Sequence, residues 1–263
     1  MRICRVALDD ELFFGLIEGL DDDGAITDST LIALLEGHPF GELIPEGRLV
    51  RAADARLVAP ILPSKVIAVG RNYVDHAREL GNEVPTTPMI FLKPSTSVVG
   101  PGEPIALPWQ SERVDHEAEL AVVIGRMCRE VPVERVPEVV LGYTCANDVT
   151  ARDLQASDGQ WGRAKGFDTF CPLGPWILTD VEPDALALTC SVNGEVRQSA
   201  STADMVFDVP ELVSWISSVM TLLPGDVIVT GTPAGIGPVR SGDEVSVSIE
   251  GIGTLTNPVV DRE

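Results

Sequence analysis

Short apolar segments rich in β-branched residues recur along the chain, and each ends at a glycine or a turn. Segments of this length and composition are typical of buried strands. The clearest examples are residues 65–70, 89–92, 120–125, 141–146, 226–231 and the alternating segment 245–249. Asn193 and Gly194 separate two further segments, and this pair predicts a hairpin closed by a type I′ turn.

Helical spacing predicts three helices in the main part of the chain, over residues 74–80, 133–140 and 210–220. These helices do not alternate regularly with the predicted strands, which argues against a doubly wound parallel sheet. We therefore expect an α+β, strand-rich fold with mixed strand directions and peripheral helices.

The beginning of the chain differs from the rest and is interpreted as a small N-terminal domain, residues 1–55. The polar run over residues 45–54 contains Pro45 and Gly47 and predicts a connection. The main domain then covers residues 56–263.

Two elements are expected within this first domain. Residues 5–8 and 12–17 predict an antiparallel hairpin around Asp9 and Asp10. Residues 29–35 have helical spacing behind a suitable capping residue, so a helix is predicted there.

The chain is strongly acidic, with a formal net charge of −21 over 263 residues. Such a surface repels phosphate backbones, so we expect no nucleic-acid partner. No run approaches the ~20 apolar residues of a membrane span, and the start lacks the features of a signal peptide. We therefore expect a cytoplasmic protein without a membrane partner. The five cysteines form no C-x-x-C pair, which indicates reduced thiols.

Glu117 and Glu119 stand two residues apart at the start of the apolar segment 120–125. On a strand both side chains point to the same face, where adjacent carboxylates repel unless a proton or a cation lies between them. Oxygen ligands without a neighbouring cysteine favour Mg²⁺ or Mn²⁺. Asp148 offers a third carboxylate, although the sequence does not show that it is near. Solvated acids on an edge strand are the alternative interpretation.

His76 and Glu79 lie three residues apart in a predicted helix and so share one face. A carboxylate beside an imidazole fixes its tautomer and raises its basicity, which is how a protein activates water. The alternative is an ordinary surface pair. The polar segment 81–88 that follows suits a mobile lid.

Residues 148–155 are typical of a helix start, which would direct Asp148, Arg152 and Gln155 toward one cavity. A capped helix with a solvated arginine is the alternative. Residues 230–237, which include Thr232, are rich in glycine but match neither a phosphate loop nor a dinucleotide fingerprint. Backbone N–H groups presented to an anion and a plain tight turn both stay open for this segment.

Six segments together resemble the fumarylacetoacetate hydrolase superfamily, in order and from about residue 57 to residue 260. They are residues 65–76, 91–95, 117–120, 147–155, 165–170 and 230–237. The first 55 residues match only loosely, as a variable N-terminal domain. The resemblance implies a mixed β-roll with peripheral helices, usually assembled as a homodimer.

The resemblance also implies roles for individual residues. It implies that Glu117, Glu119 and Asp148 are Mg²⁺ or Mn²⁺ ligands, and that His76 and Glu79 form a water-activating pair on a lid.

It further implies that Lys165 stabilises developing oxyanion charge. Arg152, Gln155 and Thr232 match positions that line the substrate site. The chain has three lysines, and the other two, Lys65 and Lys93, also fall inside the matching segments.

For such a site we expect a small 2-oxo acid as substrate. The first hypothesis is metal-dependent hydrolysis of a C–C bond in an acylpyruvate-type 2,4-dioxo acid, such as fumarylpyruvate or acetylpyruvate, through a metal-stabilised pyruvate enolate. The alternatives are oxaloacetate decarboxylation and isomerisation of 2-hydroxyhepta-2,4-diene-1,7-dioate or 5-carboxymethyl-2-hydroxymuconate at the same site. A catalytically silent binding protein is a third class, but no residue of the site is missing.

Overall fold

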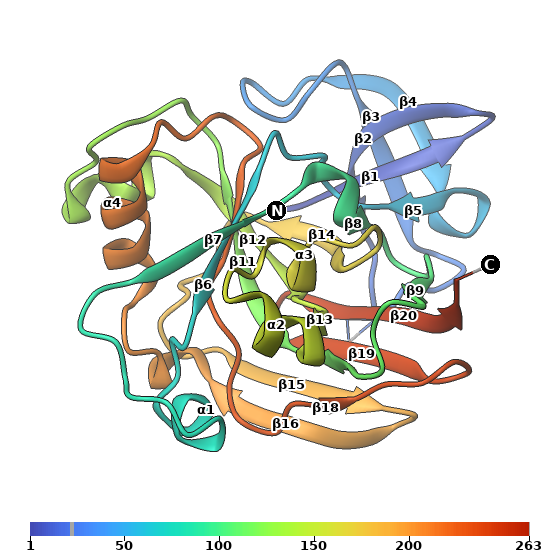
Figure 1. Ribbon diagram of the computed structural model, residues 1–263. Coiled ribbons are helices and arrows are strands. Elements are labelled where there is room, and N and C mark those ends of the chain that lie inside the picture. The colour runs from blue at the N-terminus through green and yellow to red at the C-terminus, as the bar shows by residue number, and fades with distance from the viewer. Residues whose placement is uncertain (22–23, 263) are drawn as a thin grey trace.

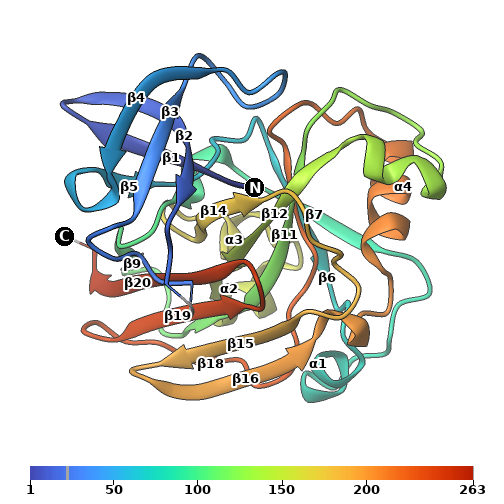
Figure 2. The same ribbon diagram turned by 180° about the vertical axis from the view of Figure 1, so that it is seen from behind.

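The computed structural model describes residues 1–21 and 24–262, and Figure 1 shows a fold built mainly from strands. Short helices lie at the periphery, with α4 (Val209–Val219) on the opposite side of the molecule from the N-terminal strands in both views (Figures 1 and 2). The expected α+β, strand-rich architecture with mixed strand directions is confirmed. Within the described residues, no helix is long and apolar enough to cross a membrane.

The largest sheet has the strand order β4-β3-β2-β1-β14-β12-β11-β17-β6-β7, with β5 paired to β1 and β8 paired to β14. The pairs β17·β6 and β14·β8 are parallel, and the other pairs in this sheet are antiparallel. Its strands are β1 (Arg2–Leu8), β2 (Glu11–Glu18), β3 (Leu31–Leu35), β4 (Pro45–Arg51), β5 (Arg56–Val58), β6 (Val66–Gly70), β7 (Met89–Lys93), β8 (Val98–Val99), β11 (Ala118–Ile124), β12 (Val140–Asn147), β14 (Cys171–Leu178) and β17 (Val227–Val229).

A second, five-stranded sheet has the order β16-β15-β19-β20-β9, and a small third sheet has the order β13-β10-β18. Their strands are β9 (Ile105–Leu107), β10 (Val114–His116), β13 (Thr150–Ala151), β15 (Ala187–Val192), β16 (Glu195–Ser201), β18 (Gly237–Pro238), β19 (Glu244–Ile249) and β20 (Gly253–Asp261). Leu120 and Val122 of the large sheet share a buried core with Leu188 and Val247 of the second. The two sheets therefore enclose one core. The acidic residues lie where the chain passes from β10 into β11 and just after the end of β12.

The other helices are short. They are α1 (Val74–Glu79), α2 (Arg152–Asp158) and α3 (Gly162–Lys165), with 3₁₀ segments at Ala52–Asp54, Ser95–Ser97, Val133–Glu138 and Thr202–Asp204. The longer helix α4 begins with a reciprocal cap, in which Asp208 accepts from the Glu211 backbone and Glu211 accepts from the Asp208 backbone. Its apolar face, which includes Leu212 and Ile216, packs into the core.

Both predicted hairpins are confirmed. Strands β1 and β2 pair around Asp9 and Asp10, which both have positive φ. Strands β15 and β16 pair across Asn193 and Gly194, whose φ values of 52° and 79° fit the predicted type I′ turn.

The prediction of a helix over residues 29–35 is wrong, and so is the prediction of a connection over residues 45–54. These segments contain β3 and β4, which continue the sheet from the β1–β2 hairpin. Ile32 and Leu34, two residues apart, are both buried in the small core under this hairpin. Packing on the open edge of a hairpin therefore outweighed the local helical spacing.

The segment expected to form a helix at residues 133–140 forms only a 3₁₀ turn at Val133–Glu138, because Pro137 within it cannot donate a helical hydrogen bond. The helix expected to start near Asp148 begins instead at Arg152, after the short strand β13. Asp148 itself lies in the short connection between β12 and β13.

Candidate active site

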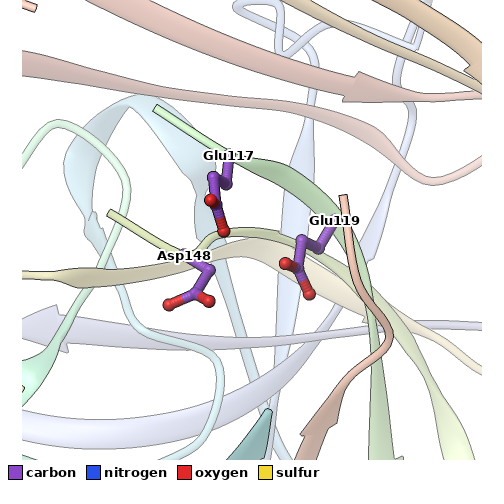
Figure 3. Close-up of side chains that lie close together, drawn as sticks. All are labelled: Glu117, Glu119 and Asp148. Atoms are coloured by element: carbon purple, nitrogen blue, oxygen red, sulfur yellow. The ribbon is translucent and has the colours of Figure 1, made fainter. Parts of the chain in front are cut away.

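Three carboxylates converge where strands β11 and β12 pair, and Figure 3 shows them turned toward a common space. Ala118 lies opposite Asn147 in the antiparallel register, so Glu117 and Asp148 are brought side by side. The pairing is extended by two further bonds. The Asp148 N–H donates to the Glu117 carbonyl over 2.8 Å, and the Glu117 N–H donates to the Asn147 side chain over 2.9 Å. Strand register thus supplies the proximity that the sequence alone did not show.

Glu117, Glu119 and Asp148 can each offer one oxygen such that all three oxygens lie within 4.8 Å of one another. All three residues are at most 3% exposed. Buried anions at this spacing are costly unless a cation lies among them. An all-oxygen donor set of this kind fits Mg²⁺ or Mn²⁺ better than zinc.

Basic side chains surround two of the three acids. Lys165 Nζ donates over 2.6 Å to both Glu117 and Asp148. Lys93 is fully buried and pairs with Asp148, and Arg152 pairs with Glu117. Burial alone would raise the pKa of Glu117, but Lys165 and Arg152 outweigh burial and hold that pKa well below its ordinary value.

Glu119 is different, because none of the described basic side chains lies within ion-pair distance of it. Its carboxylate accepts the Gly231 N–H over 2.6 Å. Burial raises the pKa of Glu119 well above its ordinary value, and the charges of Asp148 and Glu117 raise it further. Glu119 is therefore the acid whose ionisation gains most from a bound cation.

His76 and Glu79 form the expected pair on helix α1, with 3.3 Å between His76 Nδ1 and Glu79 Oε2. The other Glu79 oxygen accepts the Gly235 N–H over 3.1 Å, which ties α1 to the 230–237 segment. With Nδ1 donating to Glu79, Nε2 is left as the proton acceptor. Burial lowers the pKa of His76, and the nearby Glu117 and Glu79 only partly offset this, so the ring is neutral near pH 7.

A cavity of about 350 Å³ opens above the carboxylates. Seven of the nine candidate residues line it: His76, Glu117, Glu119, Arg152, Gln155, Lys165 and Thr232. The remaining two contact residues that line the cavity: Glu79 lies 3.3 Å from His76, and Asp148 accepts a hydrogen bond from Lys165. Structure and sequence therefore agree on which residues come together, while their roles stay predictions.

Two of the lining residues are fixed by their neighbours. Arg152 donates to Asp115 over 2.9 Å and to Gln155 over 2.8 Å. The Thr232 hydroxyl donates to the Ala118 carbonyl over 2.9 Å. The Arg152 and Thr232 side chains are thus held in place by the protein itself.

The structure also resolves the open question about residues 230–237. Two of their backbone N–H groups, those of Gly231 and Gly235, donate to carboxyl groups of the protein itself, those of Glu119 and Glu79. Gly231 has a φ of 99°, and a Cβ there would lie 2.7 Å from Asn72 Cβ, so this position requires glycine.

Several supporting residues escaped the sequence analysis. Asp115 anchors Arg152, and its place beside Glu117 in the chain was an available signal. Lys93 was singled out only as a scarce lysine without a role. Gln198 donates to Thr232 over 2.7 Å and accepts from the Ala118 N–H over 3.0 Å. Gln198 lies in the distant β15–β16 hairpin, and nothing in the sequence pointed to it.

The chain belongs to the fumarylacetoacetate hydrolase family, because residues 65–260 match the family described as fumarylacetoacetate (FAA) hydrolase C-terminal. Residues 1–60 match a second family, described as Rv2993c-like, N-terminal. The fold class and the resemblance noted in the sequence are thereby confirmed.

Three relatives bear on the chemistry. A 5-carboxymethyl-2-hydroxymuconate delta-isomerase from Mycobacterium smegmatis is 53% identical, with a TM-score of 0.92 and coverage of 100% of both chains. The mitochondrial oxaloacetate tautomerase of Rattus norvegicus is 45% identical over 224 residues, which is 81% of this chain and 70% of the relative. A fumarylpyruvate hydrolase from Pseudomonas aeruginosa, in complex with Mn²⁺ and pyruvate, is 35% identical with a TM-score of 0.73, covering 79% of this chain and 92% of its own. The relatives are enzymes of one superfamily with different reactions.

Proposed function

We propose that this protein is a divalent-metal-dependent isomerase or tautomerase that moves a proton between the enol oxygen and a carbon atom of a small 2-oxo acid. That carbon is C3 in oxaloacetate and C5 in a conjugated 2-hydroxy-2,4-dienoate. The observation that carries the proposal is a buried neutral base, His76, lining the same cavity as two of three clustered carboxylates and a lysine. Relatives at 45–53% identity are named for tautomerisation and isomerisation, whereas three structures named as hydrolases are 33–37% identical. This support favours the alternative considered in the sequence analysis over hydrolysis.

The residues divide the work between charge stabilisation and proton transfer. A divalent cation held by Glu117, Glu119 and Asp148 would supply Lewis acidity toward the carboxylate and 2-oxo oxygens of the substrate. His76 Nε2 removes or returns the proton on carbon, at C3 in oxaloacetate and at C5 in a 2-hydroxy-2,4-dienoate, and Glu79 keeps the ring oriented.

Lys165 carries the positive charge that an enolate oxygen needs. Burial alone would lower the pKa of Lys165, but Asp148 and Glu117 more than offset this and raise it. The ammonium group therefore remains protonated and can donate to the developing oxyanion.

Hydrolysis of an acylpyruvate is the second candidate, because the same His76–Glu79 pair could activate a water molecule. The relative from Pseudomonas aeruginosa is named for that reaction. The two functions differ in their products, since only hydrolysis of the C3–C4 bond releases pyruvate from a 2,4-dioxo acid.

A substrate panel tests the proposal. The enol form of oxaloacetate, 2-hydroxyhepta-2,4-diene-1,7-dioate, acetylpyruvate and fumarylpyruvate are each incubated with Mg²⁺, Mn²⁺ or excess chelator. We expect metal-dependent isomerisation of at least one of the first two and little pyruvate from the others. Rapid pyruvate release from acetylpyruvate or fumarylpyruvate, without isomerase activity, would establish the hydrolase instead. Full activity in the chelator would refute metal dependence for both.

The pH dependence follows from His76. Because burial places its pKa below the ordinary 6.5, the base stays deprotonated and active down to below pH 6.5. We expect kcat to fall only at lower pH, as His76 becomes protonated. A kcat profile across pH 4.5–8, with stability checked at each pH, measures this limb. An acidic limb centred above pH 6.5 would contradict the assignment.

A further inference from the structure

We propose that Gln198 is a positioning residue for the metal site, because its side-chain amide fixes the backbone between Glu117 and Glu119. This inference rests on the proposed function, since it assumes that a divalent cation binds at the three clustered carboxylates. Gln198 lies on β16 of the second sheet and is fully buried. It is not among the residues that line the cavity, so it acts only through the residues that it holds.

The backbone between the two glutamates lies beyond the end of a neighbouring strand. Strand β17 pairs with β11 as far as Val229, which lies opposite Ala121. The Thr230 backbone N–H then donates to the Leu120 carbonyl over 3.0 Å. Two residues nearer the start of β11, at Ala118, the partners on this edge are side chains. Buried backbone groups need hydrogen-bond partners, so these side chains take the place of a paired strand.

Gln198 and Thr232 hold both backbone groups of Ala118. The Ala118 N–H donates to Gln198 Oε1 over 3.0 Å, and the Ala118 carbonyl accepts from the Thr232 hydroxyl over 2.9 Å. Gln198 Nε2 in turn donates to Thr232 Oγ1 over 2.7 Å. The three bonds form a closed ring that fixes the backbone at Ala118. Because the two carboxylates of Glu117 and Glu119 leave the chain on either side of Ala118, this ring sets their directions (Figure 3).

The remaining hydrogen-bonding capacity of the Gln198 amide is also used. Oε1 accepts from His116 Nδ1 over 3.1 Å, and Nε2 donates to the Pro233 carbonyl over 2.8 Å. An amide oxygen accepts two bonds and an amide nitrogen donates two, so all four bonds of Gln198 are made. Gln198 therefore holds the residue before Glu117 as well as the residue after it, and a fully satisfied buried network of this kind is rigid.

The glycine-rich segment that includes Gly231 and Gly235 is held against β16 at the same point. A Cβ at Gly235 would lie 2.2 Å from the Arg197 carbonyl oxygen, so this close approach requires glycine. The N–H groups of Gly231 and Gly235 donate to Glu119 and Glu79 respectively. The contact with β16 therefore supports one of the clustered carboxylates and the residue that orients the proposed base.

Direct measurement of Mn²⁺ binding tests this role. Gln198→Leu has nearly the same size as the wild-type residue and removes all four bonds. Calorimetric titration well below the melting temperature should show an affinity for Mn²⁺ about ten- to a hundredfold lower, the usual effect of losing a group that orients metal ligands. The electron paramagnetic resonance spectrum of bound Mn²⁺ should change as well, since it reports the symmetry of the ligands. A residue that only stabilises the fold would lower the melting temperature and leave both quantities unchanged.

Two further variants complete the experiment. Thr232→Val removes the hydroxyl from the ring and keeps the bond between Gln198 and the Ala118 N–H, so we expect a smaller loss of Mn²⁺ affinity in the same direction. It also tests the ring if Gln198→Leu does not fold. Val196→Thr changes an exposed residue of the same strand to one of similar size and is the matched control, with Mn²⁺ affinity expected to stay unchanged.

The outcomes separate the two proposals. Wild-type Mn²⁺ affinity in Gln198→Leu, or in Thr232→Val where Gln198→Leu does not fold, would overturn the role of Gln198 and leave the proposed function intact. Failure of the wild-type protein to bind Mn²⁺ would overturn both.

Discussion

Replacing His76 with alanine lowers kcat for the proton transfer by about 10²–10⁴-fold, the usual contribution of a general base. Affinity for Mn²⁺ stays nearly unchanged, because His76 is bonded to Glu79 and is not one of the three clustered carboxylates. Steady-state kinetics and Mn²⁺ titration of the same preparation measure the two effects. A loss of metal affinity equal to the loss of rate would mean that His76 acts as a ligand.

Two further variants make this result specific. His38→Ala removes an exposed histidine of the N-terminal region and should leave kcat unchanged. Glu79→Gln keeps the size of the side chain but weakens its hold on His76, so we expect an intermediate loss of rate. Normal activity of His76→Ala would mean that His76 is not the general base.

Replacing Glu119 with glutamine has opposite effects with and without metal. Mn²⁺ affinity falls by more than about a hundredfold, because substitutions in the shell that merely supports metal ligands already cost 10–100-fold. The metal-free protein becomes more stable, by about 0.5–2 kcal/mol, as is common when an unfavourable functional group is removed. Glutamine retains an oxygen that can accept the Gly231 N–H.

The pH dependence of this difference in stability follows from the pKa of Glu119. Since its folded pKa lies above the ordinary 4.5, its contribution to stability is fully present below that pH and is lost as pH rises toward the folded pKa. The extra stability of metal-free Glu119→Gln over the metal-free wild type should therefore increase as the pH rises above 4.5. Thermal unfolding at several pH values measures it, with exposed Glu195→Gln as the control. A variant that is less stable than the metal-free wild type across this range would refute the account of Glu119.

Added Mn²⁺ should raise the melting temperature of the wild type and leave that of Glu119→Gln nearly unchanged. A ligand at 100 times its dissociation constant stabilises the folded state by about 2.7 kcal/mol. An equal rise for both proteins would place the metal elsewhere.

The sequence predicted the parts of the molecule whose signals are local. The Asn193–Gly194 turn and the alternation of strand β19 both depend on neighbouring residues, and the structure has them as expected. The pair His76 and Glu79 belongs to the same class, because three residues of helix bring the two side chains together.

The sequence alone did not predict the features that depend on contacts between distant segments of the chain. Residues 31–35 form a strand because the edge of β2 is available to them, and their own spacing suggested a helix. Asp148 reaches Glu117 only through the β11–β12 register, so its position came from the family resemblance. Gln198 reaches the site from another sheet.

The most direct test of the central claim follows one substrate and two products. The enol form of oxaloacetate is mixed with the Mn²⁺-loaded protein, and loss of the enol is recorded by absorbance while pyruvate is measured with a coupled dehydrogenase. Proton transfer at C3 predicts that the enol is consumed much faster than with His76→Ala, with the four-carbon keto acid as product and pyruvate only at the uncatalysed rate. Pyruvate formed in step with enol loss would contradict the account, and so would enol loss no faster than without protein if 2-hydroxyhepta-2,4-diene-1,7-dioate is also left unchanged.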